Sequence, residues 1–225
     1  MRATSTDRDL PGRAARGKSG AVKVATDPER FVLLEIATPL GGLLCVADVA
    51  GVLRVADWAD CPDRFARLLR RHCGRAPQDL VACDRLSTIR AALDAYFAGQ
   101  VGALDDVEVG LVGTEFQHAV WRVLRGLRPG ETISYAELAS RAGRPGASRA
   151  AGAANGANPI SVIVPCHRAI GSNGELTGYA GGLARKRWLL AHERAALGRA
   201  QADSGTSTAA PVNRPSRNPA SASFA

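Results

Sequence analysis

One short segment of the chain places a nucleophile beside a base and a cation: Pro165-Cys166-His167-Arg168. The thiolate is the nucleophilic form of cysteine, and nearby positive charge lowers the pKa of a thiol. Histidine is the side chain that most often moves protons in catalysis. The segment therefore indicates a nucleophilic cysteine, and a buried, inert cysteine is the alternative. Because successive side chains on a strand point to opposite faces, His167 need not touch the sulfur.

The residues around this segment predict how the cysteine is presented. An apolar run over residues 160–164 predicts a short strand that stops at Pro165, which has no N–H for a ladder. A turn over 171–174 and a glycine-rich loop over 177–182 follow, and the loop can close over a pocket. A last helix is expected over 184–193. Cys166 is thus predicted to lie at a strand end beside a pocket.

Three helices are predicted upstream of the cysteine. Thr114 and Gln117 form a capping box that opens the first helix, which Pro129-Gly130 ends. A second capping box, Ser134-Tyr135-Ala136-Glu137, opens a short helix that runs to about residue 142. After a glycine-containing turn, a third helix is expected over 147–156. Two short helices joined in this way form a helix-turn-helix pattern.

The third helix is built almost entirely from alanine and glycine, with Ser148, Arg149 and Asn155 interspersed. Small residues permit tight helix packing, and they also make a helix thin enough to enter a groove of DNA. A reader of the major groove normally presents several long polar side chains. If this helix binds DNA, we expect contacts to the backbone and minor groove with little sequence specificity.

The rest of the chain predicts a smaller unit and two flexible ends. Strands are expected over 31–36, 43–46 and 52–55, and helices over 62–72 and 87–97. The predicted organisation is a disordered basic arm (1–29), an N-terminal α/β domain (30–108), a basic helical domain (109–196) and a disordered tail (197–225). The fold class is α+β, and its C-terminal helical domain carries a helix-turn-helix, winged-helix-like element.

Composition limits the class of protein. The 225 residues carry a net charge of +8, distributed as +3 over 1–30, −3 over 31–110, +6 over 111–196 and +2 over 197–225. The basic third segment favours an anionic partner such as nucleic acid, and a merely solvated basic surface is the alternative. No apolar run reaches the roughly 20 residues that a membrane span needs, so we expect a cytoplasmic protein with no membrane partner. Five cysteines without a close pair indicate free thiols.

Several spaced elements together resemble the O6-alkylguanine-DNA alkyltransferases, also called methylated-DNA–protein-cysteine methyltransferases. The resemblance rests on Pro165-Cys166-His167-Arg168, on Asn158-Pro159-Ile160 before it and on Thr177-Gly178-Tyr179-Ala180-Gly181-Gly182 after it. It extends over residues 111–193, and Thr38-Pro39-Leu40-Gly41 resembles the opening of the family's N-terminal domain. The resemblance implies that residues 109–196 form a DNA-binding alkyltransferase domain.

The resemblance implies a role for each matching residue. Cys166 would take the alkyl group from guanine O6 in a single, irreversible turnover. Glu193 would orient His167, which would draw the thiol proton through a water. Tyr135 would donate a proton toward guanine N3, and Asn158 would hold the active turn. The base must leave the duplex stack to reach the sulfur.

The resemblance also implies a DNA interface and a pocket. Arg149 would fill the place of the flipped base, and the predicted DNA contacts are Arg149, Tyr135, Ser148, Ala150, Asn155 and Arg168. The predicted pocket residues are Ala169, Tyr179, Ala180 and Gly181. Ala169 and Ala151 stand where valine is usual, which predicts looser packing.

The partner implied by the resemblance is double-stranded DNA containing O6-alkylguanine, with O4-methylthymine open as a second substrate. We expect a monomer that needs no cofactor and no metal. Cys61, His72, Cys73 and Cys83 do not follow a recognisable zinc-ligand spacing.

The sequence leaves three alternative functions. A protein that binds alkylated DNA without transfer would lack the acceptor, and Cys166 is present. A helix-turn-helix regulator is disfavoured by the lack of base-reading side chains over 147–156. A cysteine hydrolase would need an oxyanion hole, for which the sequence gives no separate signal.

Overall fold

The computed structural model describes residues 31–82 and 86–205. A four-stranded sheet has the order β3-β2-β1-β4, formed by β1 (Phe31–Thr38), β2 (Gly41–Asp48), β3 (Leu53–Trp58) and β4 (Val81–Ala82). The first three strands pair antiparallel, and β4 runs parallel to β1. The three strands predicted from the sequence are confirmed; β1 and β2 are longer than predicted, and β3 begins one residue later and ends three residues later.

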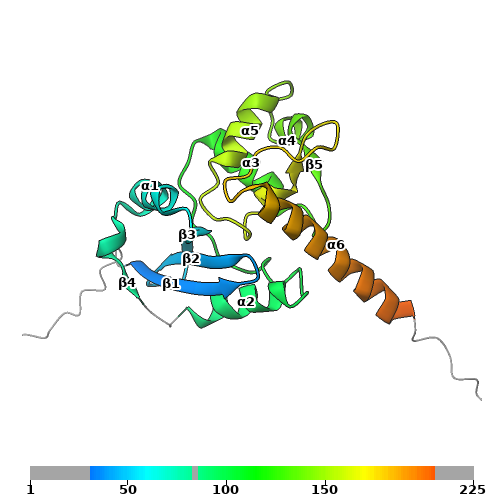
Figure 1. Ribbon diagram of the computed structural model, residues 1–225. Helices are drawn as coiled ribbons and strands as arrows, with labels where there is room; N and C mark the ends of the chain where they lie inside the picture. Colours follow the sequence, from blue (N-terminus) through cyan, green and yellow to red (C-terminus); the bar gives the residue numbers. More distant parts are fainter. Residues whose placement is uncertain (1–30, 83–85, 206–225) are drawn as a thin grey trace, which may run out of the picture.

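Alternate residues of the central strand β2 face two different cores. Val46 packs with Phe65 and Leu69 beneath α1 (Pro62–Cys73), whereas Leu43 and Cys45 join the larger core on the opposite face. That larger core includes α2 (Ser87–Phe97) and the C-terminal helices, so the sheet is covered on both faces (Figure 1). A short 3₁₀ turn, η1 (Pro77–Asp79), leads into β4.

The C-terminal domain is built from three short helices that pack on one another: α3 (Glu115–Arg125), α4 (Tyr135–Arg141) and α5 (Ser148–Gly156). The first predicted capping box is confirmed, because Gln117 N donates to Thr114 Oγ1 at 3.3 Å and Thr114 N donates to Gln117 Oε1 at 3.0 Å. Two short parallel strands, β5 (Ile133–Ser134) and β6 (Ala169–Ile170), join the start of α4 to the cysteine segment.

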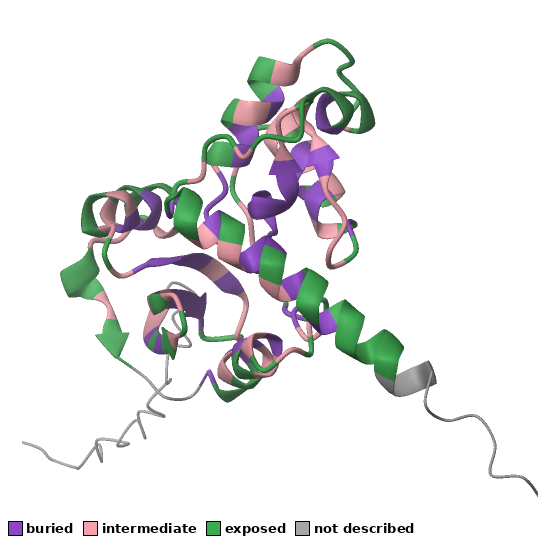
Figure 2. Cartoon of the chain, turned by 45° about the vertical axis from the view of Figure 1, so that its right-hand side comes forward, coloured by how far each residue is buried: buried purple, intermediate pink, exposed green. Residues whose placement is uncertain are grey.

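The last helix, α6 (Leu183–Gly205), lies diagonally between the two domains and then projects beyond them (Figure 1). Its first turns alternate between buried and exposed residues, and its far end is exposed (Figure 2). The predicted tail is therefore wrong for residues 197–205, which are helical. The predicted basic arm and residues 206–225 lie outside the described residues. Over the described ranges, no helix has the length and apolar character required to cross a membrane.

Candidate active site

The segment that leads to Cys166 is a buried turn, and the predicted strand over 160–164 is wrong. Ser161 N donates to Ala56 O of β3 at 2.7 Å, so the segment makes one bridge to the sheet and then turns away. Val162 has a φ of 71°, in the left-handed region that strands do not use. This segment is followed by a 3₁₀ helix, η2 (Cys166–Arg168), which begins at the cysteine.

A single buried amide holds this turn, in the role predicted for Asn158. Its Nδ2 donates to Val164 O at 2.8 Å and to Ile160 O at 3.2 Å, and its Oδ1 accepts from Ile160 N at 3.0 Å. The side chain thus replaces the strand partners that the backbone of an apolar run would otherwise need. Asn158 therefore fixes the position from which Cys166 starts.

Cys166 lies at a pocket of about 280 Å³. The pocket is lined from α1, α4, α5 and the glycine-rich loop by Arg64, Tyr135, Gly152, Asn155, Gly156, Cys166, Gly178, Tyr179 and Ala180. Of the four predicted pocket residues, Tyr179 and Ala180 line it. Ala169 does not, because its side chain is buried in the core and its carbonyl accepts from Lys186 Nζ at 2.6 Å. Gly181 packs against Trp58 instead.

His167, the residue after the cysteine, is paired with Glu193 in the core. His167 Nε2 lies 2.9 Å from Glu193 Oε1, and both side chains are fully buried. Because a carboxylate can only accept, Nε2 carries the proton and Nδ1 keeps its lone pair. Within the described part of the chain, Nδ1 has no hydrogen-bond partner. This nitrogen is therefore free to take up a proton.

Glu193 is held from several sides. Arg168 Nε donates to Oε2 at 3.0 Å and its Nη2 donates to Oε1 at 2.9 Å, while Gly130 N donates to Oε2 at 2.8 Å. Tyr96 Oη of α2 donates to Oε1 at 2.9 Å. The prediction that Arg168 contacts DNA is wrong: its side chain is 6% exposed and its remaining Nη1 donates to Leu127 O.

The charge states of the two central groups follow from burial. Burial raises the pKa of the Cys166 thiol, and the Asn158 amide and the charges of Arg64 and Lys186 only partly oppose this. The expected net lowering by positive charge is therefore wrong. Burial lowers the pKa of His167 despite the opposing effect of Glu193. At neutral pH the pair is a thiol and a neutral imidazole, so the sulfur needs a base when it reacts.

Tyr135 is placed by the start of α4. It follows the N-cap Ser134, whose Oγ accepts from Glu137 N at 3.1 Å. Its ring lines the pocket, and its Oη donates to Thr177 O of the loop at 3.3 Å. Burial raises the pKa of Tyr135. The phenol is therefore protonated at neutral pH and has a proton to donate.

The first turn of α5 presents the predicted DNA contacts Arg149 and Ala150 to the solvent, with Ser148 partly buried. The opposite side of the helix is packed, because Ala151 and Ala154 are buried in the core. Tight packing therefore accounts for the small residues on that side of the helix, and a role in DNA binding stays a prediction for the exposed side. Asn155, predicted to touch DNA, is 4% exposed and its Nδ2 donates to Cys166 O at 3.3 Å, so that prediction is wrong.

The sequence and structure of this chain are similar to those of one known protein family. A family model described as "6-O-methylguanine DNA methyltransferase, DNA binding domain" matches residues 115–195. The methylated-DNA--protein-cysteine methyltransferase of Salmonella typhimurium is 48% identical over 164 residues, which are 73% of this chain and 96% of the relative. The chain belongs to the methylated-DNA--protein-cysteine methyltransferase family.

Solved structures agree with this assignment. The crystal structure of Mycobacterium tuberculosis O6-methylguanine methyltransferase has a TM-score of 0.60 and 39% identity, covering 73% of this chain and 93% of that one. The structure of the Mycobacterium tuberculosis protein in complex with DNA has a TM-score of 0.62 and 38% identity, covering 74% and 94%. The expected α+β fold class is thereby confirmed.

Sequence reasoning missed two cations beside the cysteine of this methyltransferase-family chain. Arg64 reaches the pocket from the N-terminal domain, where it pairs with Asp57 and its Nη2 donates to Asn158 O at 2.9 Å. No local signal marks it. Lys186 is fully buried, and the spacing from Lys186 to Glu193, two turns of one helix face, could have revealed it.

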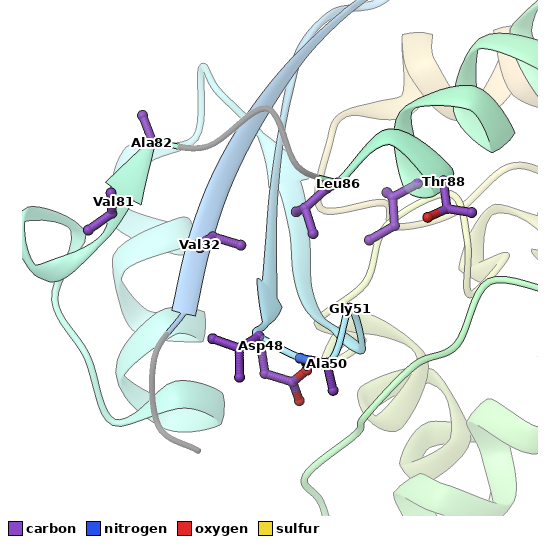
Figure 3. A pocket seen from close by; sticks show the side chains of 10 residues that line it. Val32, Asp48, Ala50, Gly51, Val81, Ala82, Leu86 and Thr88 are labelled. Atoms are coloured by element: carbon purple, nitrogen blue, oxygen red, sulfur yellow. Dashed lines mark hydrogen bonds between the residues drawn. The ribbon is translucent and has the colours of Figure 1, made fainter. Parts of the chain in front are cut away.

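A second hollow, of about 600 Å³, lies in the N-terminal domain between β1, β4 and the start of α2 (Figure 3). Asp48 is the one ionisable side chain among its described lining residues, and it is engaged by Arg54 and the backbone. The described lining of this hollow therefore contains no thiol, no histidine and no unpaired carboxylate. Among the described residues, no group of three or more His, Cys, Asp or Glu side chains is arranged to hold a metal ion.

Proposed function

We propose that this chain repairs DNA by transferring the alkyl group of O6-alkylguanine to the sulfur of Cys166. The observation that carries the proposal is that Cys166 lines a pocket, while the residue next to it in the chain, His167, is paired with Glu193 in the core. The family supports it, since its named members are methylated-DNA--protein-cysteine methyltransferases.

The step balances as a substitution at the alkyl carbon. The Cys166 thiol gives its proton to His167 Nδ1, through the water that the resemblance implies, and the sulfur forms a bond to carbon as the carbon–O6 bond breaks. Tyr135 donates a proton toward N3, so that guanine does not leave as an anion. The charges left on His167 and Tyr135 cancel by proton exchange with water. Sulfur ends with the alkyl group in place of its proton, and guanine ends neutral.

A thioether is not reversed by cellular reductants, so each molecule would act once. Extrusion of the base is required, because Cys166 is only 7% exposed and no thiol can reach into a stacked duplex. We propose that Arg149, at the exposed start of α5, enters the duplex where the base has left. The thin exposed face of α5, with Ala150 beside it, would let the helix lie close to the DNA backbone.

We also propose that the protein acts in the cytoplasm. The acceptor must remain a thiol, and the cysteines in the described part of the chain, Cys45, Cys61, Cys73 and Cys166, are all free. A reducing compartment preserves that state.

The proposal is tested by intact mass and peptide mapping after incubation with a duplex that carries one O6-methylguanine. The expected result is one methyl group per protein, on the Cys166 peptide, and none in Cys166→Ala. Tight, selective binding without any gain in mass would overturn transfer and leave a damage-binding protein. Repeated turnover on an ester would point to a hydrolase.

A further inference from the structure

The glycine-rich loop (177–182) forms one wall of the pocket beside Cys166. Gly178, Tyr179 and Ala180 line the pocket from this loop, which has no regular secondary structure of its own. The width of the pocket therefore depends on what holds the loop in place. Two neighbouring cations at the start of α6, Arg185 and Lys186, hold its two ends.

The first end of the loop is held from within the C-terminal domain. Lys186 Nζ donates to Thr177 O at 2.7 Å and to Ala169 O at 2.6 Å. Tyr135 Oη donates to the same Thr177 carbonyl. Because Lys186 is fully buried, this end is anchored to the core of the domain that carries the cysteine.

The second end is held by the N-terminal domain through one guanidinium. Arg185 Nη1 donates to Gly181 O at 3.0 Å, its Nε donates to Leu40 O at 3.1 Å, and its Nη2 donates to Asp60 Oδ2 at 2.8 Å. The guanidinium also lies 4.5 Å from the centre of the Trp58 ring, a cation–π distance. Arg185 therefore joins the loop to the β1–β2 turn and to the end of β3.

Trp58 leaves no room between the loop and the sheet. A Cβ atom at Gly181 would overlap the indole of Trp58, which is itself fully buried. The loop thus approaches the N-terminal domain as closely as its backbone permits. Tyr179 and Ala180 span the short distance between the two anchored ends.

We infer that Arg185, stacked on Trp58, is a positioning residue that sets the width of the pocket and so limits the size of the alkyl group that Cys166 accepts. The inference rests on the proposed alkyl transfer. Without Arg185 the Gly181 end is released, while Lys186 keeps the Thr177 end in place. The loop then swings outward, so a bulky alkyl group gains room while a methyl group loses its close fit.

The test compares two substrates that differ only in alkyl size. Duplexes of one sequence carry either O6-methylguanine or O6-benzylguanine, and the rate constant for alkylation of Cys166 is followed by mass. For Arg185→Ala, the ratio of the benzyl to the methyl rate constant should rise about tenfold. This is the low end of the change in selectivity that one extra or missing methylene group causes in an apolar pocket. Arg194→Ala, an exposed arginine on the same helix, should leave the ratio unchanged.

Arg185→Lys is a second variant that tests the inference if Arg185→Ala does not fold. It keeps a cation over Trp58, but one ammonium cannot reproduce the planar fork that reaches three segments. The ratio should move in the same direction by a smaller factor. An unchanged ratio in the folded variants, including an equal loss on both substrates, would overturn the inference. Failure of the wild-type chain to react with the methyl duplex would instead overturn the proposed function.

Discussion

Replacing Glu193 by glutamine removes the charge on which five donor atoms converge. The donors are Tyr96 Oη, His167 Nε2, Arg168 Nε, Arg168 Nη2 and Gly130 N. A glutamine of the same size offers one accepting oxygen, and its amide group faces donors. Breaking a buried ion pair by removing one partner costs about 3–5 kcal/mol. Since a domain is stabilised by about 5–15 kcal/mol, we expect a large loss in the free energy of unfolding.

The loss should also depend on pH with a defined sign. Burial opposes ionisation of Glu193, but the hydrogen bonds from His167 and Arg168 and the positive charge of Arg168 outweigh it and lower the pKa of Glu193 below the ordinary 4.5. A carboxylate with a lowered folded pKa stabilises fully above its unfolded pKa, and this stabilisation fades as the pH falls through the folded value. The difference in the free energy of unfolding between wild type and Glu193→Gln should therefore be largest at pH 6–8, above the ordinary glutamate pKa of 4.5, and should shrink in acid.

Urea unfolding between pH 3 and pH 8, a range set about the 4.5 reference, measures this difference directly. Glu175→Gln, at an exposed position, is the matched control and should change little. Repair by Glu193→Gln should slow by about 10²-fold or more, because His167 loses the group that orients it. A loss below about 1 kcal/mol at pH 7, or one that persists unchanged in acid, would refute the ion-pair reasoning.

Further predictions concern DNA, the pocket and the N-terminal domain. Arg149→Ala should slow repair of duplex DNA far more than reaction with a free O6-substituted guanine; equal losses would contradict a role in base extrusion. Binding to duplex should weaken steeply with salt and vary little with sequence, and a salt-independent binding constant would exclude phosphate-dominated contact. Arg64→Met removes a charge that lowers the Cys166 pKa, so alkylation should require higher pH; an unshifted pH profile would argue otherwise. Burial, with a smaller effect of Arg71, lowers the pKa of His72 from 6.5 to about 4; stability should therefore fall from pH 6.5 to 4, and His72→Phe should flatten that slope in thermal unfolding.

Local patterns predicted most of the helices and strands. The capping residues Thr114 and Ser134 start helices where the sequence places them, because their side chains satisfy amide groups within three residues. Gly74 ends α1 in the left-handed conformation expected of a C-terminal glycine. These features depend on neighbours in the sequence and are therefore readable from it.

The wrong predictions and the missed residues share one cause, which is contact between residues far apart in the sequence. The apolar run over 160–164 has the composition of a strand, but Asn158 satisfies its backbone and turns it. An arginine beside the cysteine suggests a DNA contact, but the side chain of Arg168 is buried and paired with the carboxylate of Glu193, 25 residues later in the sequence. Arg64 and Tyr96 reach the site from the other domain. Partners so distant in the sequence leave no local pattern.

The left-handed backbone of Val162 bears on where the energy of DNA binding goes. A β-branched residue at a φ of 71° is strained by about 1–3 kcal/mol, and it persists only where the surroundings outweigh that strain. The cradle of the sulfur is thus already assembled in the free protein, with Asn158 closing it. Contacts with the duplex need not build the nucleophile's surroundings. Their free energy remains for drawing the damaged base out of the helix.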